Sequence, residues 1–344
     1  MPTKRRAGWI GILAARLLLP GCAAAIADNG PSTQPTAFFL VGDRYTNYSL
    51  VKAAPEESGY TVVLPPSNDL DSFSVSSDGL RLVCFHSFLG ERGVGPPSHE
   101  EFDVIAPDGR SIKTLPWSGP YITWLNGPPV FLPDGKHIGF AAVIHDPLEG
   151  RNGGGGGPQG VASIASLFTV DIESGKYTIV ATASIDHPEL LDASYGERLD
   201  LKDGQIESIS HPNWSADGKT ILLTVKYGNG ARLWQMDFDG RNPHEIASDE
   251  RREGAFSPDG RQIAYLHGEE LWVSAADGGN ARMLTQMKPL IASPRWLADG
   301  KTIEFYREDR PIIFGSIWLI DLDGSLRRVN SSENAHIDEQ NEIG

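Results

Sequence analysis

One short phrase recurs five times in this chain and constrains its fold more than any other feature. Each copy ends in an Asp-Gly pair, at Asp78, Asp134, Asp217, Asp259 and Asp299. An apolar residue stands three positions before each Asp, and others stand four and six positions after it, as Trp214, Ile221 and Leu223 do around Asp217. A repeat of this kind decides the architecture of a whole chain, because every copy must adopt the same local structure.

The repeat predicts paired hairpins. Alternating apolar residues after a tight turn indicate a strand that leaves a hairpin. Asp hydrogen-bonds to backbone just downstream, and Gly accepts the left-handed conformation that ends the turn. A second turn follows each phrase, at Asp108-Gly109, Ser174-Gly175, Asp239-Gly240, Asp277-Gly278 and Asp323-Gly324. Two hairpins make a four-stranded antiparallel unit of about 40 residues, which is the size of a propeller blade.

The fullest copies resemble a known family. Phe256-Ser257-Pro258-Asp259-Gly260-Arg261, continued by Ile263 and Tyr265 and later by a D-x-D-G hairpin of the kind at Asp237–Gly240, is similar to the TolB-type, WD40-like (PD40) propeller repeat. The resemblance covers roughly residues 36–330 and implies an all-β propeller. The first copy departs from the pattern, with Ser77 in place of Pro and Leu80 in place of a basic residue. No Gly-His…Trp-Asp signature appears, which argues against a true WD40 protein.

The count of blades is six. The five phrases give five blades, and 36–64 adds three strands of another, at Phe38–Val41, Tyr48–Val51 and Tyr60–Leu64. The tail after Asn330, with His336 and Ile337, is expected to supply the missing innermost strand and close the ring, since an open ring exposes sheet edges. The predicted fold is therefore a six-bladed TolB-like β-propeller of four-stranded antiparallel blades, forming one domain over 36–344.

The first 35 residues predict export. Lys4-Arg5-Arg6 precedes a short apolar run, and residues 1–21 have the shape of a secretory signal. Leu19-Pro20-Gly21-Cys22 resembles a bacterial lipoprotein lipobox, which implies lipidation of Cys22 at the start of the mature chain. The alternative is an ordinary signal cleaved among Ala23–Ala25. Residues 22–35 are read as a polar tether, and the apolar run falls short of the roughly 20 residues that span a membrane.

Charge and cysteine content exclude several function classes. The formal net charge is −15, and it becomes −19 without residues 1–21, which hold four basic residues and no acids. Such a chain repels phosphate backbones, so nucleic acid is not an expected partner, and membrane contact is expected only through the lipid. Cys84 occupies an apolar column of the repeat and is expected to be a small buried hydrophobe. A monomer is expected.

The long insertions should carry the function. The Asp-Gly turns all belong to one face of the disc, whereas Ser87–Glu101, Ile144–Ala165 and Ser184–Ser208 belong to the other and come from neighbouring blades. Loops on a rigid scaffold concentrate binding residues. The candidate binding residues on this rim are Arg92, His99, Glu100, His145, Asp146, Arg151, His187, Arg198 and His211. None of them has a recognised metal-ligand spacing, and neither a metal nor a cofactor is predicted.

His211 has two interpretations. It precedes Asp217 by six residues, in the expected innermost strand, where it can point into the axial channel. Oligogalacturonate lyases, propellers of related repeat type, hold a metal with channel histidines, but the matching positions in the other copies are Ser72, Pro128, Glu253 and Ser293. The simpler interpretation is a hydrogen-bonded histidine of the fold.

The leading functional hypothesis is a non-enzymatic binding protein of the bacterial envelope. The chain has no Gly-x-Ser-x-Gly motif and no room for the hydrolase domain that follows related propellers. It would hold a protein or peptide on the face of the long insertions. The alternative is a glycan-binding or metal-dependent, lyase-like propeller, and a purely structural module is a third reading.

Overall fold

The computed structural model describes a ring of β-sheets. It describes residues 24–27, 36–42, 48–53, 61–89, 97–120, 122–145, 163–184, 197–198, 206–227, 230–246, 249–286, 291–309 and 314–331. These residues form six sheets, all antiparallel apart from one short strand, and no helix occurs among them. The predicted six-bladed, all-β architecture is confirmed.

The first two blades are regular. Blade 1 contains β1 (Ala24–Ala27), β2 (Thr36–Gly42), β3 (Tyr48–Ala53) and β4 (Thr61–Ser67). Blade 2 contains β5 (Leu70–Val75), β6 (Leu82–Leu89), β7 (Pro97–Ile105) and β8 (Ser111–Pro116). In each blade the strands pair in chain order, from the axis outward.

Blade 3 is the irregular one. Its innermost position is shared by β9 (Ile122–Leu125) and β10 (Val130–Phe131), which pair with opposite halves of β11 (His137–His145). β12 (Ser163–Asp171) and β13 (Tyr177–Ser184) follow, and β14 (Glu197–Arg198) adds a short parallel strand to β13.

The remaining blades return to four consecutive strands. Blade 4 contains β15 (Ile206–Trp214), β16 (Thr220–Tyr227), β17 (Gly230–Asp237) and β18 (His244–Glu245). Blade 5 contains β19 (Arg251–Phe256), β20 (Gln262–His267), β21 (Glu270–Ala275) and β22 (Arg282–Gln286). Blade 6 contains β23 (Ile291–Trp296), β24 (Thr302–Asp309), β25 (Phe314–Asp321) and β26 (Leu326–Ser331).

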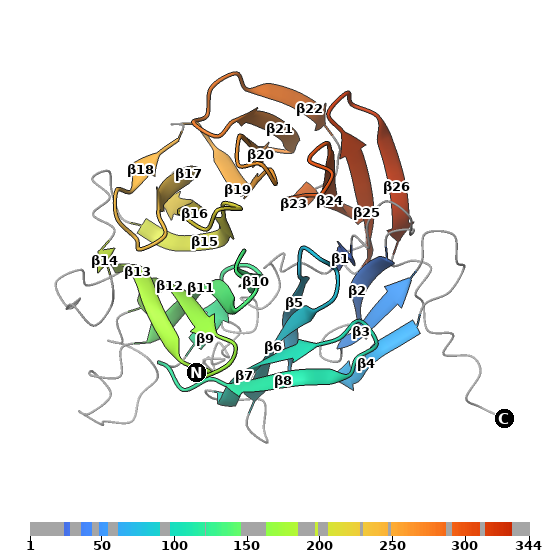
Figure 1. Cartoon of the computed structure of the whole chain (residues 1–344), viewed down its shortest axis with the longest axis vertical. Helices are drawn as coiled ribbons and strands as arrows, with labels where there is room; N and C mark the ends of the chain where they lie inside the picture. The colour runs from blue at the N-terminus through green and yellow to red at the C-terminus, as the bar shows by residue number, and fades with distance from the viewer. Residues whose placement is uncertain are drawn as a thin grey trace, which may run out of the picture.

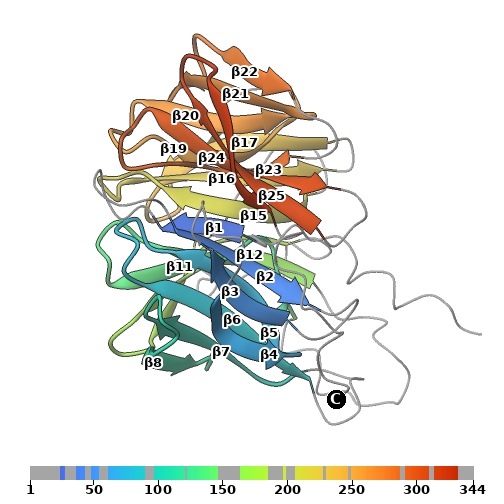
Figure 2. The same ribbon diagram turned by 90° about the vertical axis from the view of Figure 1, so that its right-hand side faces the viewer.

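The ring closes differently from the expectation. The fourth strand of blade 1 is β1, which pairs with β2 in the register Ala24↔Phe39 to Ala27↔Thr36. The innermost position is therefore filled from the N-terminal side and not by the tail after Asn330, whose residues beyond Ser331 lie outside the described part. β1 also falls inside 22–35, the range read as a tether. Blades 6 and 1 meet side by side, with β1 against β25 and β5 (Figure 1; Figure 2).

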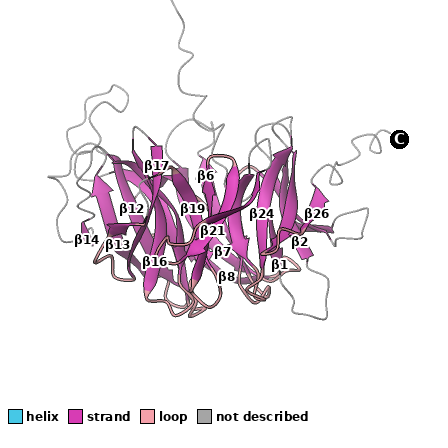
Figure 3. Cartoon of the chain, turned by 90° about the horizontal axis from the view of Figure 1, so that it is seen from above, coloured by secondary structure: helices cyan, strands magenta, loops and turns pink. Residues whose placement is uncertain are grey.

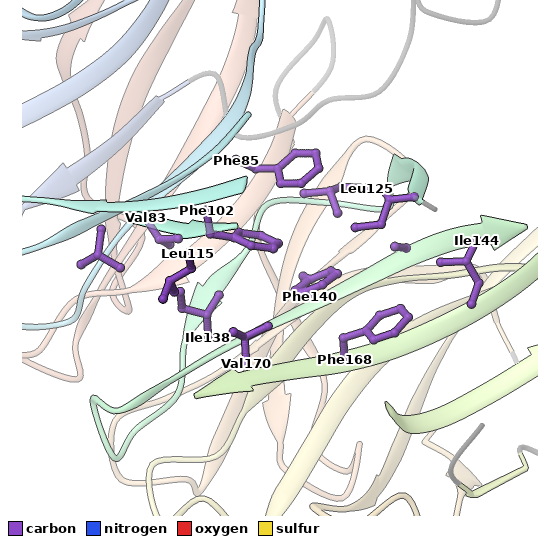
Figure 4. Packing of buried hydrophobic residues seen from close by; sticks show 13 residues of the cluster. Val83, Phe85, Phe102, Leu115, Leu125, Ile138, Phe140, Ile144, Phe168 and Val170 are labelled. Carbon is purple, nitrogen blue, oxygen red and sulfur yellow. The ribbon is translucent and has the colours of Figure 1, made fainter. Parts of the chain in front are cut away.

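The core lies between blades. Each sheet alternates its side chains between two faces, so every blade contributes to two interfaces. Figure 4 shows the interface of blades 2 and 3, where Phe85, Phe102, Phe140 and Phe168 pack together with all four rings nearly inaccessible. Cys84 points the other way, into the buried cluster between blades 1 and 2. Burial raises the pKa of its thiol, so it serves as a small hydrophobe there.

The disc has two unlike faces. The short Asp-Gly and Ser-Gly turns join the first strand to the second and the third to the fourth in each blade, and most turns gather along one edge in Figure 3. We call this side the turn face. The opposite side receives the ends of the second strands, the starts of the third strands and the links between blades; we call it the insertion face, because the long insertions of blades 2, 3 and 4 leave from it.

Candidate binding face

On the turn face, the Asp residues of the repeat accept hydrogen bonds from the backbone of their own turns. The Oδ1 atom of Asp217 accepts hydrogen bonds from the Lys219 amide at 3.1 Å and the Ser215 hydroxyl at 2.7 Å. The Ser215 hydroxyl lowers the pKa of Asp217, and Ser257 does the same for Asp259. Asp78, Asp134 and Asp299 accept from the amide two residues later in the same way. These carboxylates are committed to the turns and are poor candidates for ligand binding.

The insertions are shorter than the sequence indicated. β6 continues to Leu89 and β7 begins at Pro97, so His99 and Glu100 lie in a strand and not in a loop. β11 extends to His145, and β14 contains Arg198. Arg92, Asp146, Arg151 and His187 lie outside the described residues, as does Cys22. The strand ends that flank the three insertions nevertheless share the insertion face and belong to adjacent blades.

Glu100 is an interblade residue. Only 5% of it is exposed, and its Oε1 accepts a hydrogen bond from the Ile122 amide of blade 3 at 3.2 Å. Burial raises the pKa of Glu100 to about 7, against the opposing effect of that amide. A carboxyl group in this position links two blades and changes charge near neutral pH.

His99 lies at the surface beside an aromatic stack. Its ring stacks on Phe88 with centroids 4.0 Å apart and an interplanar angle of 14°. Phe88 also stacks on His86, whose Nε2 lies 3.6 Å from Oδ2 of Asp103. His86 and Phe88 were not among the candidates, although period-two alternation along β6 puts them on one side of the strand. His99 is thus a predicted rim residue that the structure places on the open surface.

His211 occupies a recurring bulge near the axis. Its φ is +49°, and Glu253 and Ser293, the equivalent residues of blades 5 and 6, have φ +54°. In all three blades the register shifts at this point of the innermost strand. A left-handed conformation often marks a functional residue. Here it recurs in three blades, so it belongs to the fold and is no sign of function specific to His211.

These bulges connect neighbouring blades. The His211 amide donates to the Asn126 carbonyl at 2.9 Å, and the Ser293 amide donates to Oε2 of Glu253 at 2.7 Å. The ring of His211 packs on Gly127, where an added Cβ would stand 3.1 Å from Cδ2. Both ring nitrogens are shielded from solvent without a hydrogen-bond partner, in contrast to the hydrogen-bonded histidine expected. The two ring nitrogens of one histidine, without a second ligating side chain beside them, do not form a ligand site.

Trp124 is a large aromatic residue that is exposed near the axis, toward the insertion face. It belongs to β9, beside the start of blade 3, and 42% of it is exposed. Its Nε1 donates to Oδ1 of Asn126 at 2.9 Å, which fixes the indole. Sequence reasoning missed Trp124 because the phrase before Asp134 breaks at Asn126–Pro129, so the residue fell outside the repeat's apolar columns.

Stacked arginines mark the insertion face of the other half of the ring. Three guanidinium groups lie over aromatic rings at centroid distances of 5.0, 4.8 and 5.9 Å: Arg232 on Tyr227, Arg251 on Tyr265 and Arg307 on Trp318. Arg251 also pairs with Asp249, with Nε and Oδ1 2.6 Å apart. The sequence did carry a signal for it, since Arg251 stands where three of the other four copies have an apolar residue, at Leu70, Ile209 and Ile291.

Among the described residues, no three His, Cys, Asp or Glu side chains lie close enough to hold a metal ion together. A search of the same residues finds no helix long and apolar enough to cross a membrane.

Comparisons with known proteins agree with the fold. No protein-family model matches the chain. The Tol-Pal system protein TolB of Anaeromyxobacter dehalogenans is 36% identical over 90 residues, which is 25% of this chain and 21% of that protein. The chain therefore matches about a fifth of the length of this relative.

Solved structures match over more of the chain. TolB from Acinetobacter baumannii aligns with a TM-score of 0.57 and 17% identity, covering 85% of this chain and 62% of that one. A putative TolB from Agrobacterium tumefaciens aligns with a TM-score of 0.51 and 16% identity, covering 80% and 85%. At these identities the likeness concerns the fold.

Proposed function

We propose, from the TolB-like six-bladed β-propeller that this chain forms, that it is a non-enzymatic protein of the bacterial envelope that holds a protein or peptide partner on its insertion face. The observation that carries this proposal is the asymmetry of the disc. One face consists of short turns whose carboxylates are used internally, and the other receives three insertions from adjacent blades. Binding residues concentrate on such loops because the scaffold beneath them is rigid.

The composition of the insertion face suits a protein partner. Exposed Trp124 and His99 lie on adjacent blades, and aromatic residues are enriched where proteins bind one another. The Arg232, Arg251 and Arg307 stacks continue around the ring. Arginine is also enriched at such interfaces. Arg232 and Arg251 pair with Glu245 and Asp249 of this chain, so the surface suits an aromatic segment of a partner protein better than an acidic one.

The TolB relatives support a protein as the class of partner. The curated relatives are named as components of a Tol-Pal system, and we extend to this chain only the coarser property of binding a protein in the envelope. Export follows from the signal-like residues 1–21, and we propose that Cys22 carries a lipid anchor. The protein then acts as a monomer tethered at its N-terminus.

A cross-linked capture from intact cells of the native host tests this function. The tagged wild-type protein is compared with a variant lacking Arg151–Gly160 and with Trp124→Ala, and bound proteins are identified by mass spectrometry. Phe238→Ala is the matched control, because Phe238 is an aromatic residue 59% exposed on the turn face. Loss of one partner in the first two variants but not in the control supports the proposal. Equal capture by all four proteins contradicts it.

A further inference from the structure

Near the insertion face, four side chains gather on the side of blade 2 that faces blade 1: His86, Phe88, His99 and Glu101. Their positions follow from the pairing of β6 with β7, which is regular from Leu82 to Phe88. Residues two apart on a strand share a side, and Cys84 of the same row packs in the buried cluster between blades 1 and 2. The row therefore continues from the core of this interface out to the exposed His99.

Blade 1 contributes an aromatic ring from the opposite side of the boundary. Tyr48 begins β3 at the insertion face, and 36% of it is exposed. It lies on the same side of β3 as Leu50, which packs in the cluster shared with blade 2. Strands β3, β6 and β7 thus bring aromatic rings to the same boundary from two adjacent blades (Figure 1). We call the following residues the boundary cluster: Tyr48, Phe88, His99 and Glu101.

The charged groups at this end of the boundary are mainly acidic. Glu101 is half-buried and has no ion-pair partner among the described residues. Asp103 follows it on the same side, with Oδ2 3.6 Å from Nε2 of His86. That nitrogen is shielded from solvent and has no hydrogen-bond partner. Lys52 is the one Lys or Arg among the described strand residues that face this boundary, and its Nζ donates to the Pro107 carbonyl, at the turn-face end.

Blade 4 has an arginine beside the equivalent ring. Tyr227 and Phe88 are equivalent because each stands ten residues after the Asp of its repeat. The guanidinium of Arg232 lies over the Tyr227 ring, 5.0 Å from its centroid. Arg232 pairs with the residue two before Tyr227, as Glu101 pairs with the residue two before Phe88. Blade 4 therefore supplies its own cation to the ring, whereas blade 2 has a carboxylate at that position.

We propose that the boundary cluster receives an arginine side chain of the partner protein. A guanidinium is planar, so it can stack on aromatic rings while its N–H groups donate to a carboxylate. Glu101 is the accepting carboxylate, and the charge of Asp103 adds to the attraction. The inference rests on the proposed function for its choice of face, and it adds that the bound segment contains arginine. The net charge of −15 favours the approach of such a segment.

A titration of the purified protein with N-acetyl-arginine amide tests the site directly. Nuclear magnetic resonance follows the ring signals of labelled tyrosine and histidine, and we expect those of Tyr48 and His99 to shift to saturation at millimolar concentrations. N-acetyl-citrulline amide has the same shape without the charge and should leave both signals in place. N-acetyl-lysine amide has the charge without the planar group and should bind several-fold more weakly. No shift with the arginine probe, or equal binding of either other probe, overturns the proposal.

A matched pair of variants assigns the binding to Glu101. Glu101→Gln keeps the shape of the side chain and should weaken the arginine probe by about threefold to tenfold. Glu173→Gln makes the same change at an exposed position on the turn face and should leave the affinity unchanged. Equal affinity in Glu101→Gln and the wild type contradicts the proposal.

Glu101→Arg separates this inference from the proposed function. The new side chain copies Arg232 of blade 4, so it should occupy the rings and abolish binding of the arginine probe. In the cross-linked capture from intact cells, Glu101→Arg should also lose the partner that Trp124→Ala loses. Loss by Trp124→Ala with full capture by Glu101→Arg overturns the inference and leaves the proposed function standing. Binding of the arginine probe together with equal capture by every variant supports the site and contradicts the proposed function.

Discussion

At the scale of single residues, the hydrogen bonds within a turn could be predicted from the sequence, whereas the contacts of a residue with another blade could not. Asp217 and its equivalents follow from turn chemistry, since each bonds to backbone two residues on. Glu100 looked like a loop residue because it lies within the polar insertion Ser87–Glu101. Its partner in the structure is the amide of Ile122, which belongs to the next blade and is 22 residues away. No local pattern contains that contact.

Glu100 should make stability fall as the pH rises. Its folded-state pKa is raised from 4.5 to about 7, so between these values the folded protein holds a proton that the unfolded chain has lost. The stabilisation is present below about pH 4.5 and lost through pH 7, by on the order of 3 kcal/mol. Urea unfolding at pH 5 and pH 8 measures it against Glu100→Gln, which keeps the acceptor for Ile122. The contributions of all other groups are common to both proteins and cancel in the comparison. The same pH dependence in the two proteins would rule Glu100 out.

At the scale of elements, most strands could be predicted from alternation and turns, whereas β1 could not. Four residues, mostly alanine, carry no alternation and no Asp-Gly turn, and they adjoin a signal-like segment. β1 is recognisable as a strand only from its pairing with β2. The same limit applies to β9 and β10, where Asn126–Pro129 interrupts one strand position and hides the register of Trp124.

Two turns of similar sequence should respond differently to the same substitution. Gly109 and Gly218 both follow Asp and have φ of +86° and +69°. A Cβ on Gly218 meets nothing within 4 Å, whereas one on Gly109 would stand 2.2 Å from the Val63 carbonyl of blade 1. We expect Gly218→Ala to lower the free energy of unfolding by about 1 kcal/mol, through the strain of its backbone conformation alone. Gly109→Ala should lower it by at least about 2 kcal/mol more, because β4 must move away from the added methyl group. Denaturant unfolding of the pair checks this, and equal losses would mean that the turn does not dock on blade 1.

At the scale of the whole molecule, the sequence predicted the number of blades but not how the ring closes. No described sheet combines strands from the two ends of the chain, since blade 1 contains only β1–β4 and blade 6 only β23–β26. Side-chain packing therefore has to hold blades 6 and 1 together at a seam. Phe38 packs toward blade 2, and Phe39 points to the opposite face of the same sheet, toward that seam.

A substitution at the seam should open the ring before the protein unfolds. Phe38→Ala and Phe39→Ala each remove a buried ring. If each acted only on the global equilibrium, it would lower the free energy of unfolding by about 3–5 kcal/mol. Blades 1 and 2 remain joined by the chain, but the seam has no covalent link nearby. In Phe39→Ala we therefore expect amide hydrogens of β2, β3 and β25 to exchange through a local opening well below the global unfolding free energy. Phe38→Ala should instead accelerate exchange across the molecule together. Hydrogen exchange followed by mass spectrometry distinguishes the two, and identical exchange patterns would show that the seam is as strong as the other interfaces.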